Sequence, residues 1–449
     1  MKKVLLYVVL FVFFSQFSSG QASAKTQLLN ESWSHQFKNQ SIGDITVGST
    51  GNVIVPFRED YVGVGKWVSY SPNGKKLWEI NNAGVGTFSA NKETLVIYNK
   101  QNFKMYIHNL KNGSLKGSFS LPKQNGEHFN VIVDNDYIYI YQNRTSKLYV
   151  YNLKGVKVGS YQSPYEWITG MKVRNGNVYL SEYSVYGKSG FSSPNATYEG
   201  QVTMIDKNGK VLWNYNVSPI QSGDFHVSEQ GEVYLFKYNQ ISKLNNTGKL
   251  VQKNDTFEYL ALGVDTSESS SDALLITSEY RDKKPHEIIY GITADTLQPV
   301  FKQSMNLLSG TLQQIDASTM RSQYVRGVKV TPQGIFLGVN VDDYSSHTGG
   351  GYVLNYIPNG KKPRKILEKK HFFADIIFDD YNRAYVLTNK EDNLIGKGEL
   401  TVVHSDGTVL QQVSYPKSGV SMAKSNDRIY IATVDKLYSY TCSGCTKKP

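Results

Sequence analysis

A short turn-and-strand motif recurs along this chain and limits the folds that the chain can adopt. In each copy a tight turn built on glycine, most often Asn-Gly or Asp-Gly, leads directly into a short strand. The clearest copies are residues 71–78 and 207–213, and looser ones are residues 153–157, 246–250, 358–361 and 405–409. Alternating apolar runs flank each copy, which predicts a β-hairpin whose turn needs the positive φ that glycine accepts.

The motif recurs roughly every 40–50 residues with room for about four strands per repeat, which is typical of a β-propeller. Numbering the four strands of each unit from the axis outward gives complete units at residues 43–80, 86–121, 128–162, 170–217, 224–253, 260–303, 327–368 and 373–415. Three further strands follow at residues 418–423, 429–433 and 437–440. The stretch around Trp33 resembles the fourth strands, so we expect it to complete this last unit.

The expected fold is therefore all-β, a single closed β-propeller of about eight or nine four-stranded blades. The N-terminal strand would complete the last blade and remove the free sheet edge that otherwise pairs with other chains. Helical periodicity is almost absent from the sequence. Two smaller propellers are the alternative, but no linker rich in Pro, Gly or Ser divides the chain.

The first residues have the features of an export signal. Lys2 and Lys3 precede an apolar run at residues 4–14, and Ala22 and Ala24 mark a cleavage site. The run is too short to span a bilayer, which needs about 20 residues. We expect a signal peptide at residues 1–24, a propeller at 25–441 and a short tail at 442–449, in a protein secreted by a Gram-positive bacterium and found outside the cell or on its wall.

The net charge of +11 favours anionic surfaces such as cell-wall polymers, acidic polysaccharides or lipid headgroups. Because the lysines are spread over the turns, solvated side chains that protect hairpin edges explain the charge equally well. The sequence contains no nucleic-acid-binding motif, and we expect no such partner.

Long connections between the second and third strands distinguish one face of the expected propeller. They are residues 58–66, 184–200, 281–287, 342–351 and 390–398, and the link between two units at 305–323 falls on the same face. The turns between the third and fourth strands, on the other face, are short. Binding residues concentrate on long loops that a rigid scaffold positions, so we expect the function on the long-loop face.

One candidate site lies in the connection at residues 184–200, which carries Tyr186, Lys188, Phe191 and Tyr198. Exposed aromatic rings beside a cation suit stacking on sugars or contact with a protein. The same rings would also be explained by folding back over the blade.

A second candidate site is the connection at residues 342–351, with Asp342, Asp343, Tyr344 and His347. Two carboxylates and an imidazole this close can bind a metal or act as acid and base. A solvated polar loop has the same composition, and the Asp-x-Asp-x-Asp spacing of calcium loops is missing. We therefore assign no metal to it.

Cys442 and Cys445 are the only cysteines of the chain. In an exported protein a local disulfide is the first expectation. Free or intermolecular thiols are an alternative, while redox or metal chemistry lacks the helix or the further ligands that it needs.

Two copies of the motif resemble the PQQ-like repeat of quinoprotein-type propellers. The matching residues are Gly74, Lys75, Trp78, Asp206, Gly209, Lys210 and Trp213. In that family the tryptophan docks on the turn of the next blade, and the non-enzymatic members are binding or assembly scaffolds. The Ala-x-Asp start of the full repeat is missing, and the vicinal disulfide that faces the quinone has no counterpart here, so we expect no cofactor.

No catalytic signature stands out in the sequence. There is no His-Glu-x-x-His group, Gly-x-Ser-x-Gly elbow or phosphate loop. The leading hypothesis is a monomeric, non-catalytic scaffold that binds a protein, a cell-wall polymer or a polysaccharide through the long-loop face. The alternative is an extracellular carbohydrate-active enzyme whose site gathers single residues at the propeller axis.

Overall fold

The computed structural model shows a chain built from strands. It describes residues 28–38, 40–58, 64–81, 88–91, 93–99, 101–122, 129–134, 136–142, 146–186, 197–217, 225–237, 240–256, 260–264, 274–281, 284–293, 295–304, 321–343, 350–359, 361–391 and 396–442. Within these ranges every regular element is a β-strand, which confirms the all-β expectation.

The strands run as follows: β1 Leu29–Gln36, β2 Ser41–Ile42, β3 Thr46–Val47, β4 Val53–Arg58, β5 Val64–Tyr70, β6 Lys76–Asn81, β7 Phe88–Ala90, β8 Thr94–Asn99, β9 Lys104–Asn109, β10 Leu115–Ser120, β11 Phe129–Asp134, β12 Tyr137–Gln142, β13 Lys147–Asn152, β14 Lys157–Gln162, β15 Trp167–Arg174, β16 Asn177–Tyr186, β17 Thr197–Ile205, β18 Val211–Asn216, β19 Phe225–Val227, β20 Val233–Lys237, β21 Gln240–Leu244, β22 Leu250–Asn254, β23 Leu260–Val264, β24 Leu274–Arg281, β25 Lys284–Thr293, β26 Pro299–Ser304, β27 Arg321–Thr331, β28 Gly334–Asp343, β29 Gly350–Pro358, β30 Arg364–Lys369, β31 Phe372–Phe378, β32 Arg383–Asn389, β33 Gly398–His404, β34 Val409–Tyr415, β35 Gly419–Ser425, β36 Arg428–Thr433 and β37 Lys436–Cys442.

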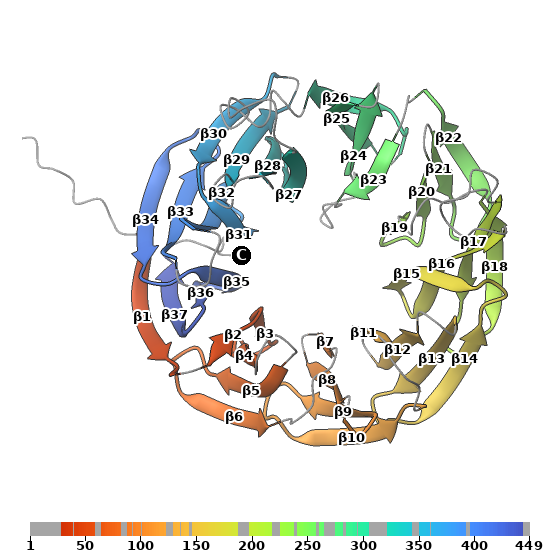
Figure 1. Ribbon diagram of the computed structural model, residues 1–449, viewed down its shortest axis with the longest axis horizontal. Helices are drawn as coiled ribbons and strands as arrows, with labels where there is room; N and C mark the ends of the chain where they lie inside the picture. Colours follow the sequence, from red (N-terminus) through yellow and green to blue (C-terminus); the bar gives the residue numbers. More distant parts are fainter. Residues whose placement is uncertain are drawn as a thin grey trace, which may run out of the picture.

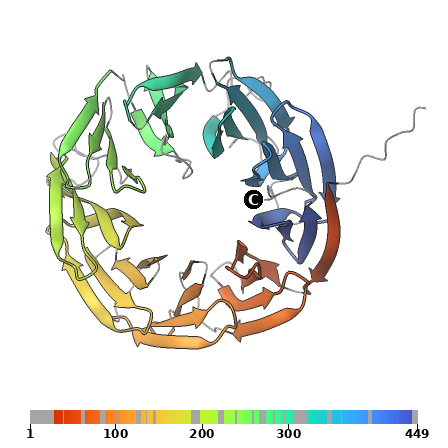
Figure 2. The same ribbon diagram turned by 180° about the vertical axis from the view of Figure 1, so that it is seen from behind.

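These strands form nine antiparallel sheets in the described ranges, eight of four strands and one of five. The sheets follow one another around a common axis in chain order, with the first strand of each sheet near the axis and the last on the outside (Figure 1). The same ring of sheets is seen from behind in Figure 2. This arrangement is that of a β-propeller.

The two ends of the chain meet in one sheet. β1 pairs antiparallel with β37, from Leu29 opposite Cys442 to Gln36 opposite Lys436. The sheet order is β1-β37-β36-β35, so the N-terminal strand is the outer strand of the last sheet, as the sequence around Trp33 predicts. Cys442 is the last residue of β37, one residue beyond the expected boundary of the propeller.

The hydrophobic core lies between neighbouring sheets. Tyr139 of β12 and Val150 of β13, for example, share one buried cluster with Leu180 of β16 and Ile205 of β17 in the next sheet. Burying an aliphatic side chain of this size contributes about 1.5–3 kcal/mol. Each sheet therefore depends on its neighbours for its stability.

Every outer strand carries a β-bulge close to its start. In β18, Val211 lies opposite Ile205 and Trp213 lies opposite Met204, which leaves Leu212 as an extra residue. The same shift in register occurs in β1, β6, β10, β14, β22, β26, β30 and β34. A bulge redirects side chains at a sheet edge.

Where the residue after the bulge is a tryptophan, its side chain contacts the next sheet. The indole Nε1 of Trp213 donates to the carbonyl of Asn246 at 3.0 Å, and that of Trp78 donates to the carbonyl of Leu110 at 3.0 Å. Trp33 of β1 makes the same contact with the carbonyl of Pro72 at 2.7 Å. Three outer strands are thus bonded to the turn of the following sheet.

The turns that receive these rings are fixed by glycine and by short polar side chains. Gly248, in the turn that receives Trp213, has a φ of 76°, and the Oδ1 of Asn245 accepts hydrogen bonds from the backbone N–H of Thr247 and Lys249, both at 3.0 Å. A Cβ atom on Gly248 would lie 2.5 Å from the ring of Trp213. Glycine is required there for two reasons, the backbone conformation and the space that the indole occupies.

Candidate functional site

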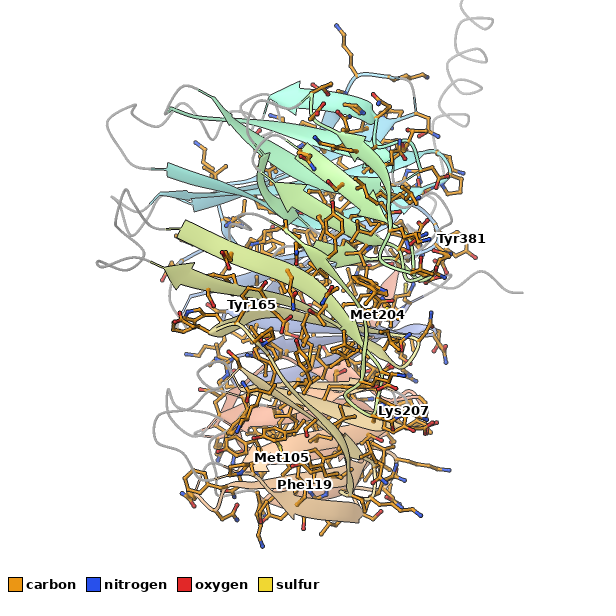
Figure 3. All side chains as sticks on the ribbon, turned by 90° about the vertical axis from the view of Figure 1, so that its right-hand side faces the viewer. Met105, Phe119, Tyr165, Met204, Lys207 and Tyr381 are labelled. Carbon is orange, nitrogen blue, oxygen red and sulfur yellow. The ribbon has the colours of Figure 1, made fainter. Side chains whose placement is uncertain are left out.

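The propeller has two faces of different construction. The short turns between the first and second and between the third and fourth strands of each sheet lie on one face, here called the turn face. The connections between the second and third strands lie on the opposite one, the hairpin face. Figure 3 shows Lys207 and Tyr381, from turns of the first kind, on one side of the ring, and Tyr165, from a connection between sheets, on the other.

On the hairpin face, strands occupy positions that the sequence assigned to loops. β16 and β17 have 10 and 9 residues, and their pairing continues to Tyr186 opposite Thr197. The expected connection at residues 184–200 is therefore strand at both ends. Val185, Tyr186, Thr197 and Tyr198 at these strand ends are β-branched or aromatic, which favours a strand.

The same correction applies to the acidic connection. β28 and β29 have 10 and 9 residues, and Asp342 lies opposite Gly350. Asp342 and Asp343 are thus the last residues of a strand and pair on the other side with Ser322 and Arg321 of β27. Aspartate and glycine have low strand propensity, so the pattern alone predicted a loop.

The structure places four of the eight candidate binding residues. Tyr186 ends β16, and Tyr198 of β17 lies opposite Val185, so the two tyrosines occupy neighbouring rungs of one ladder. Asp342 and Asp343 lie on another sheet, and two sheets separate it from the tyrosines in the ring (Figure 1). The structure does not bring the two candidate sets together. Lys188, Phe191, Tyr344 and His347 lie outside the described residues.

The described part of the chain contains no cluster of three or more His, Cys, Asp or Glu side chains that could hold a metal ion. Among the same residues, no helix is long and apolar enough to cross a membrane. Cys442 is disulfide-bonded. Cys445 lies outside the described residues, and its pairing with Cys442 stays a prediction.

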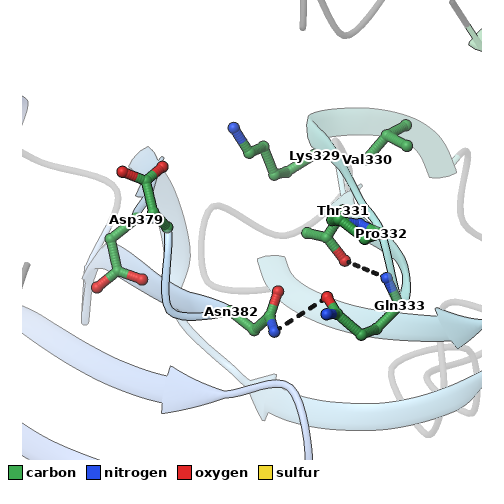
Figure 4. A pocket seen from close by; sticks show the side chains of 8 residues that line it. Lys329, Val330, Thr331, Pro332, Gln333, Asp379 and Asn382 are labelled. Atoms are coloured by element: carbon green, nitrogen blue, oxygen red, sulfur yellow. Dashed lines mark hydrogen bonds between the residues drawn. The ribbon is translucent and has the colours of Figure 1, made fainter. Parts of the chain in front are cut away.

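A pocket of about 420 Å³ lies on the turn face, between the β27–β28 turn and the β31–β32 turn. Its lining is Lys329, Val330, Thr331, Pro332, Gln333, Asp379, Asp380 and Asn382. The amides of Asn382 and Gln333 face each other, and the Nδ2 of Asn382 donates to the Oε1 of Gln333 at 3.3 Å (Figure 4). The two turns are thereby linked by a direct hydrogen bond.

Asp379 lines this pocket, and its hydrogen bonds hold its side chain in place. Its fully buried carboxylate accepts from the Nε of Arg383 at 2.5 Å and from the hydroxyl of Tyr385 at 2.9 Å. It also accepts from the backbone N–H of Tyr381 at 2.8 Å. Burial, together with the charge of Asp379, raises the pKa of Tyr385, which therefore remains a hydrogen-bond donor.

Because Asp379 is engaged in this way, Asp380 is the carboxylate of the pocket that is available to a ligand. Glycoside hydrolysis ordinarily requires two carboxyl groups on either side of the scissile bond. The pocket therefore supports binding of a polar molecule and not this reaction. The pocket was not predictable from the sequence, because its two turns are about 50 residues apart and each resembles an ordinary polar turn.

A charged cluster on the hairpin face joins the sheets β27–β30 and β31–β34. The Nζ of Lys369 donates to the Oε1 of Glu399 at 2.6 Å. Burial alone would raise the pKa of Glu399, but the hydrogen bond and charge of Lys369 hold it below its usual value. Burial lowers the pKa of the neighbouring His371, which favours a neutral imidazole. The cluster acts as an ion pair between sheets.

Comparison with known proteins supports the fold and leaves the function open. No family model and no curated protein matches this chain. A solved structure of "the eukaryotic initiation factor" is similar, with a TM-score of 0.53, 13% identity, and coverage of 85% of this chain and 90% of that one. BamB from Moraxella catarrhalis (TM-score 0.44, 11% identity, 92% and 99% covered) and the WD40 domain of SCAP from fission yeast (0.46, 10%, 91% and 98%) also match. At such identities the likeness concerns the fold alone, and only the first reaches a TM-score above 0.5.

Proposed function

We propose that this protein is a secreted, non-enzymatic scaffold that binds a partner protein through its hairpin face. The observation that carries the proposal is the length of the strand pairs β16–β17 and β28–β29, with 10 and 9 residues in each pair, which β24–β25 approaches with 8 and 10. β12 and β13, for comparison, have 6 residues each. The end of β16–β17 extends past its pairing with β15 and β18, while β27 flanks β28 as far as Asp343. A two-stranded ribbon such as the end of β16–β17 offers a partner both its side chains and its backbone edges, which is how many proteins recognise an extended segment.

The ring that supports these ribbons is proposed to be closed and nine-bladed, of the PQQ-like type. The pairing of β1 with β37 and the docking of Trp33, Trp78 and Trp213 on following turns support this assignment. A rigid ring holds the ribbons in place, so that the entropy lost when a partner binds is small. Cell-wall polymers and polysaccharides are the alternative partners, and the positive charge favours their anionic members.

The test is capture of proteins from the envelope and culture medium of the source bacterium by the immobilised chain from residue 25 onward. A trimmed variant, with residues 187–196 replaced by Asn-Gly, removes the tip of one ribbon; Tyr186 and Thr197 already pair, so a two-residue turn can join them. Tyr381→Ala on the turn face is the matched control. We expect a protein that the wild type and Tyr381→Ala retain and the trimmed variant loses. Equal capture by all three would contradict the proposal, and retention of polymer alone would favour the alternative partners.

A further inference from the structure

Exposed aliphatic side chains gather at one position of the propeller. Among the described residues the large apolar side chains with exposures of 38% or more are Leu77, Leu115, Val156, Val211, Leu212, Leu250, Val251, Tyr381, Val409 and Leu410. All except Tyr381 directly follow the turn that leads into an outer strand. Six of them form the bulges of three outer strands, Val211 and Leu212 in β18, Leu250 and Val251 in β22, and Val409 and Leu410 in β34. In β30 the extra residue of the bulge, Ile366, is buried, so exposed pairs are a feature of these three strands.

In β18 the extra residue Leu212 follows Val211, and both side chains are exposed. β22 repeats the arrangement with Leu250 and Val251. Side chains of consecutive strand residues normally point to opposite faces, so one of the two would be covered. The bulge breaks this alternation and leaves both members of the pair in contact with solvent.

The pairs on β18 and β22 lie at the starts of the outer strands of two successive sheets, and Trp213 bridges the two sheets between them. The ring of Trp213 lies against Gly248, in the turn that leads into β22, and its Nε1 donates to the carbonyl of Asn246. Exposed Lys210 and Lys249 immediately precede the two pairs. We call the surface made of Val211, Leu212, Leu250, Val251, Lys210 and Lys249 the rim patch.

The combination of side chains indicates what can cover the rim patch. A soluble polyanion would pair with the lysines and leave the four aliphatic side chains in water. A neutral apolar surface would cover the aliphatic groups and desolvate the lysines. The headgroup boundary of an anionic bilayer satisfies both, since it offers phosphates at the level of the ammonium groups and hydrocarbon just below.

We propose that the rim patch docks this protein on the surface of an anionic lipid bilayer. The patch lies on the turn face, on the same side as Lys207 in Figure 3, so docking would leave the ribbons of the hairpin face pointing away from the lipid. The inner turn of the neighbouring sheet carries Glu229 and Glu232, and the second of these is paired with Lys243. Contact is therefore made by the tilted rim and not by the whole face.

The test is co-sedimentation of the chain from residue 25 onward with vesicles of phosphatidylglycerol, compared with vesicles of phosphatidylcholine, over a salt series. We expect binding to the anionic vesicles alone, weakening as salt rises. Leu212→Ser/Val251→Ser should lower the partition coefficient about tenfold or more. Lys210→Gln/Lys249→Gln should lower it about thirtyfold at low salt.

The matched control is Val409→Ser/Leu410→Ser. This pair occupies the same bulge in β34 with exposures of 41% and 39%, but Thr408 stands where the rim patch has lysine, and the turn carries the acidic Asp406. We expect this variant to bind like the wild type, and equal unfolding midpoints will show that all variants are folded. Absence of wild-type binding, or an equal loss in the control, overturns the proposal. Loss in the lysine variant alone, with Leu212→Ser/Val251→Ser unchanged, would show simple charge adsorption and overturns it too.

Discussion

The turn face and the hairpin face use the same strands in opposite ways. On the turn face the chain reverses within a few residues, and glycines such as Gly209 and Gly248 are held at positive φ against residues of the preceding sheet. On the hairpin face β16 and β17 continue past the ends of β15 and β18, and β28 and β29 continue together with β27 past the end of β30. The contacts on the turn face therefore stabilise the fold, while the extended strands of the hairpin face are an addition that the fold does not need.

This difference predicts which substitutions should lower the stability of the fold and which should impair function. Contacts between neighbouring sheets on the turn face are long-range and buried, so their loss weakens two sheets at once. The ribbon tips extend beyond these contacts. Changes on the turn face should therefore lower stability, and changes at the ribbon tips should leave the fold intact.

The largest expected effect is that of Trp78→Ala. The side chain is nearly buried between β6 and the turn that precedes β10, and its removal leaves a cavity and takes away one of the two hydrogen bonds to the carbonyl of Leu110, the other coming from the Nδ2 of Asn52. We expect a loss of about 3–5 kcal/mol in the free energy of unfolding, measured by urea denaturation. Leu77→Ala, one residue away and exposed, should change it by less than about 0.5 kcal/mol. Similar losses in the two variants would show that the tryptophan does not hold the sheets together.

The next effect separates backbone conformation from packing. Gly248 and Gly176 have φ values of 76° and 74°, but an added Cβ meets the Trp213 ring at 2.5 Å in the first and nothing within 4 Å in the second. Gly176→Ala should cost about 1–2 kcal/mol from backbone strain alone. Gly248→Ala should cost about 1–3 kcal/mol more, because the ring must move. Equal losses of stability in thermal unfolding would mean that the ring adapts freely.

A smaller effect concerns the dependence of stability on pH. Burial lowers the pKa of His108, beside the turn at Gly113, and that of His371 on the hairpin face. The unfolded chain, with an ordinary histidine pKa of about 6.5, then binds protons more readily than the folded one, so stability falls as the pH drops below about 6.5. His108→Asn and His371→Asn should each flatten this fall, since each removes a group whose pKa burial lowers. Unfolding midpoints measured between pH 7 and pH 5 test this, and a profile as steep as that of the wild type in both variants would contradict it.

The smallest effect is expected from the trimmed ribbon. Replacing residues 187–196 by Asn-Gly keeps the rung between Tyr186 and Thr197. The free energy of unfolding should change by less than about 0.5 kcal/mol. A large loss of stability would contradict the distinction between the two faces, because it would show that the hairpin face also stabilises the fold.

The turn face was largely predictable from the sequence because its features are local. A glycine turn, a short strand and a tryptophan at fixed spacing mark Trp78 and Trp213 directly, and Trp33 was recognisable as part of an outer strand. The bulges were not predicted, since an extra residue leaves no trace in an alternating pattern of only a few residues. In the sequence, the exposed pairs at the bulges, such as Val211 and Leu212, therefore cannot be distinguished from ordinary strand residues.

The hairpin face and the pocket were harder to predict for different reasons. Strand length at Asp342 and Asp343 depends on the partners Arg321 and Ser322, which lie about 20 residues earlier and compensate for a weak local propensity. The pocket depends on the meeting of Gln333 with Asn382 from another sheet. Neither juxtaposition is encoded by spacing along the chain.

The pairing of β1 with β37 has a consequence for biosynthesis. The first strand of the propeller has as its partner the last, Lys436–Cys442, so the sheet that joins the two ends is incomplete until the final residues leave the ribosome. Contacts of such long sequence separation form slowly. A nascent chain would carry β1 without its partner until β37 has been made, and a product truncated before Lys436 would leave the outer strand of that sheet permanently unpaired.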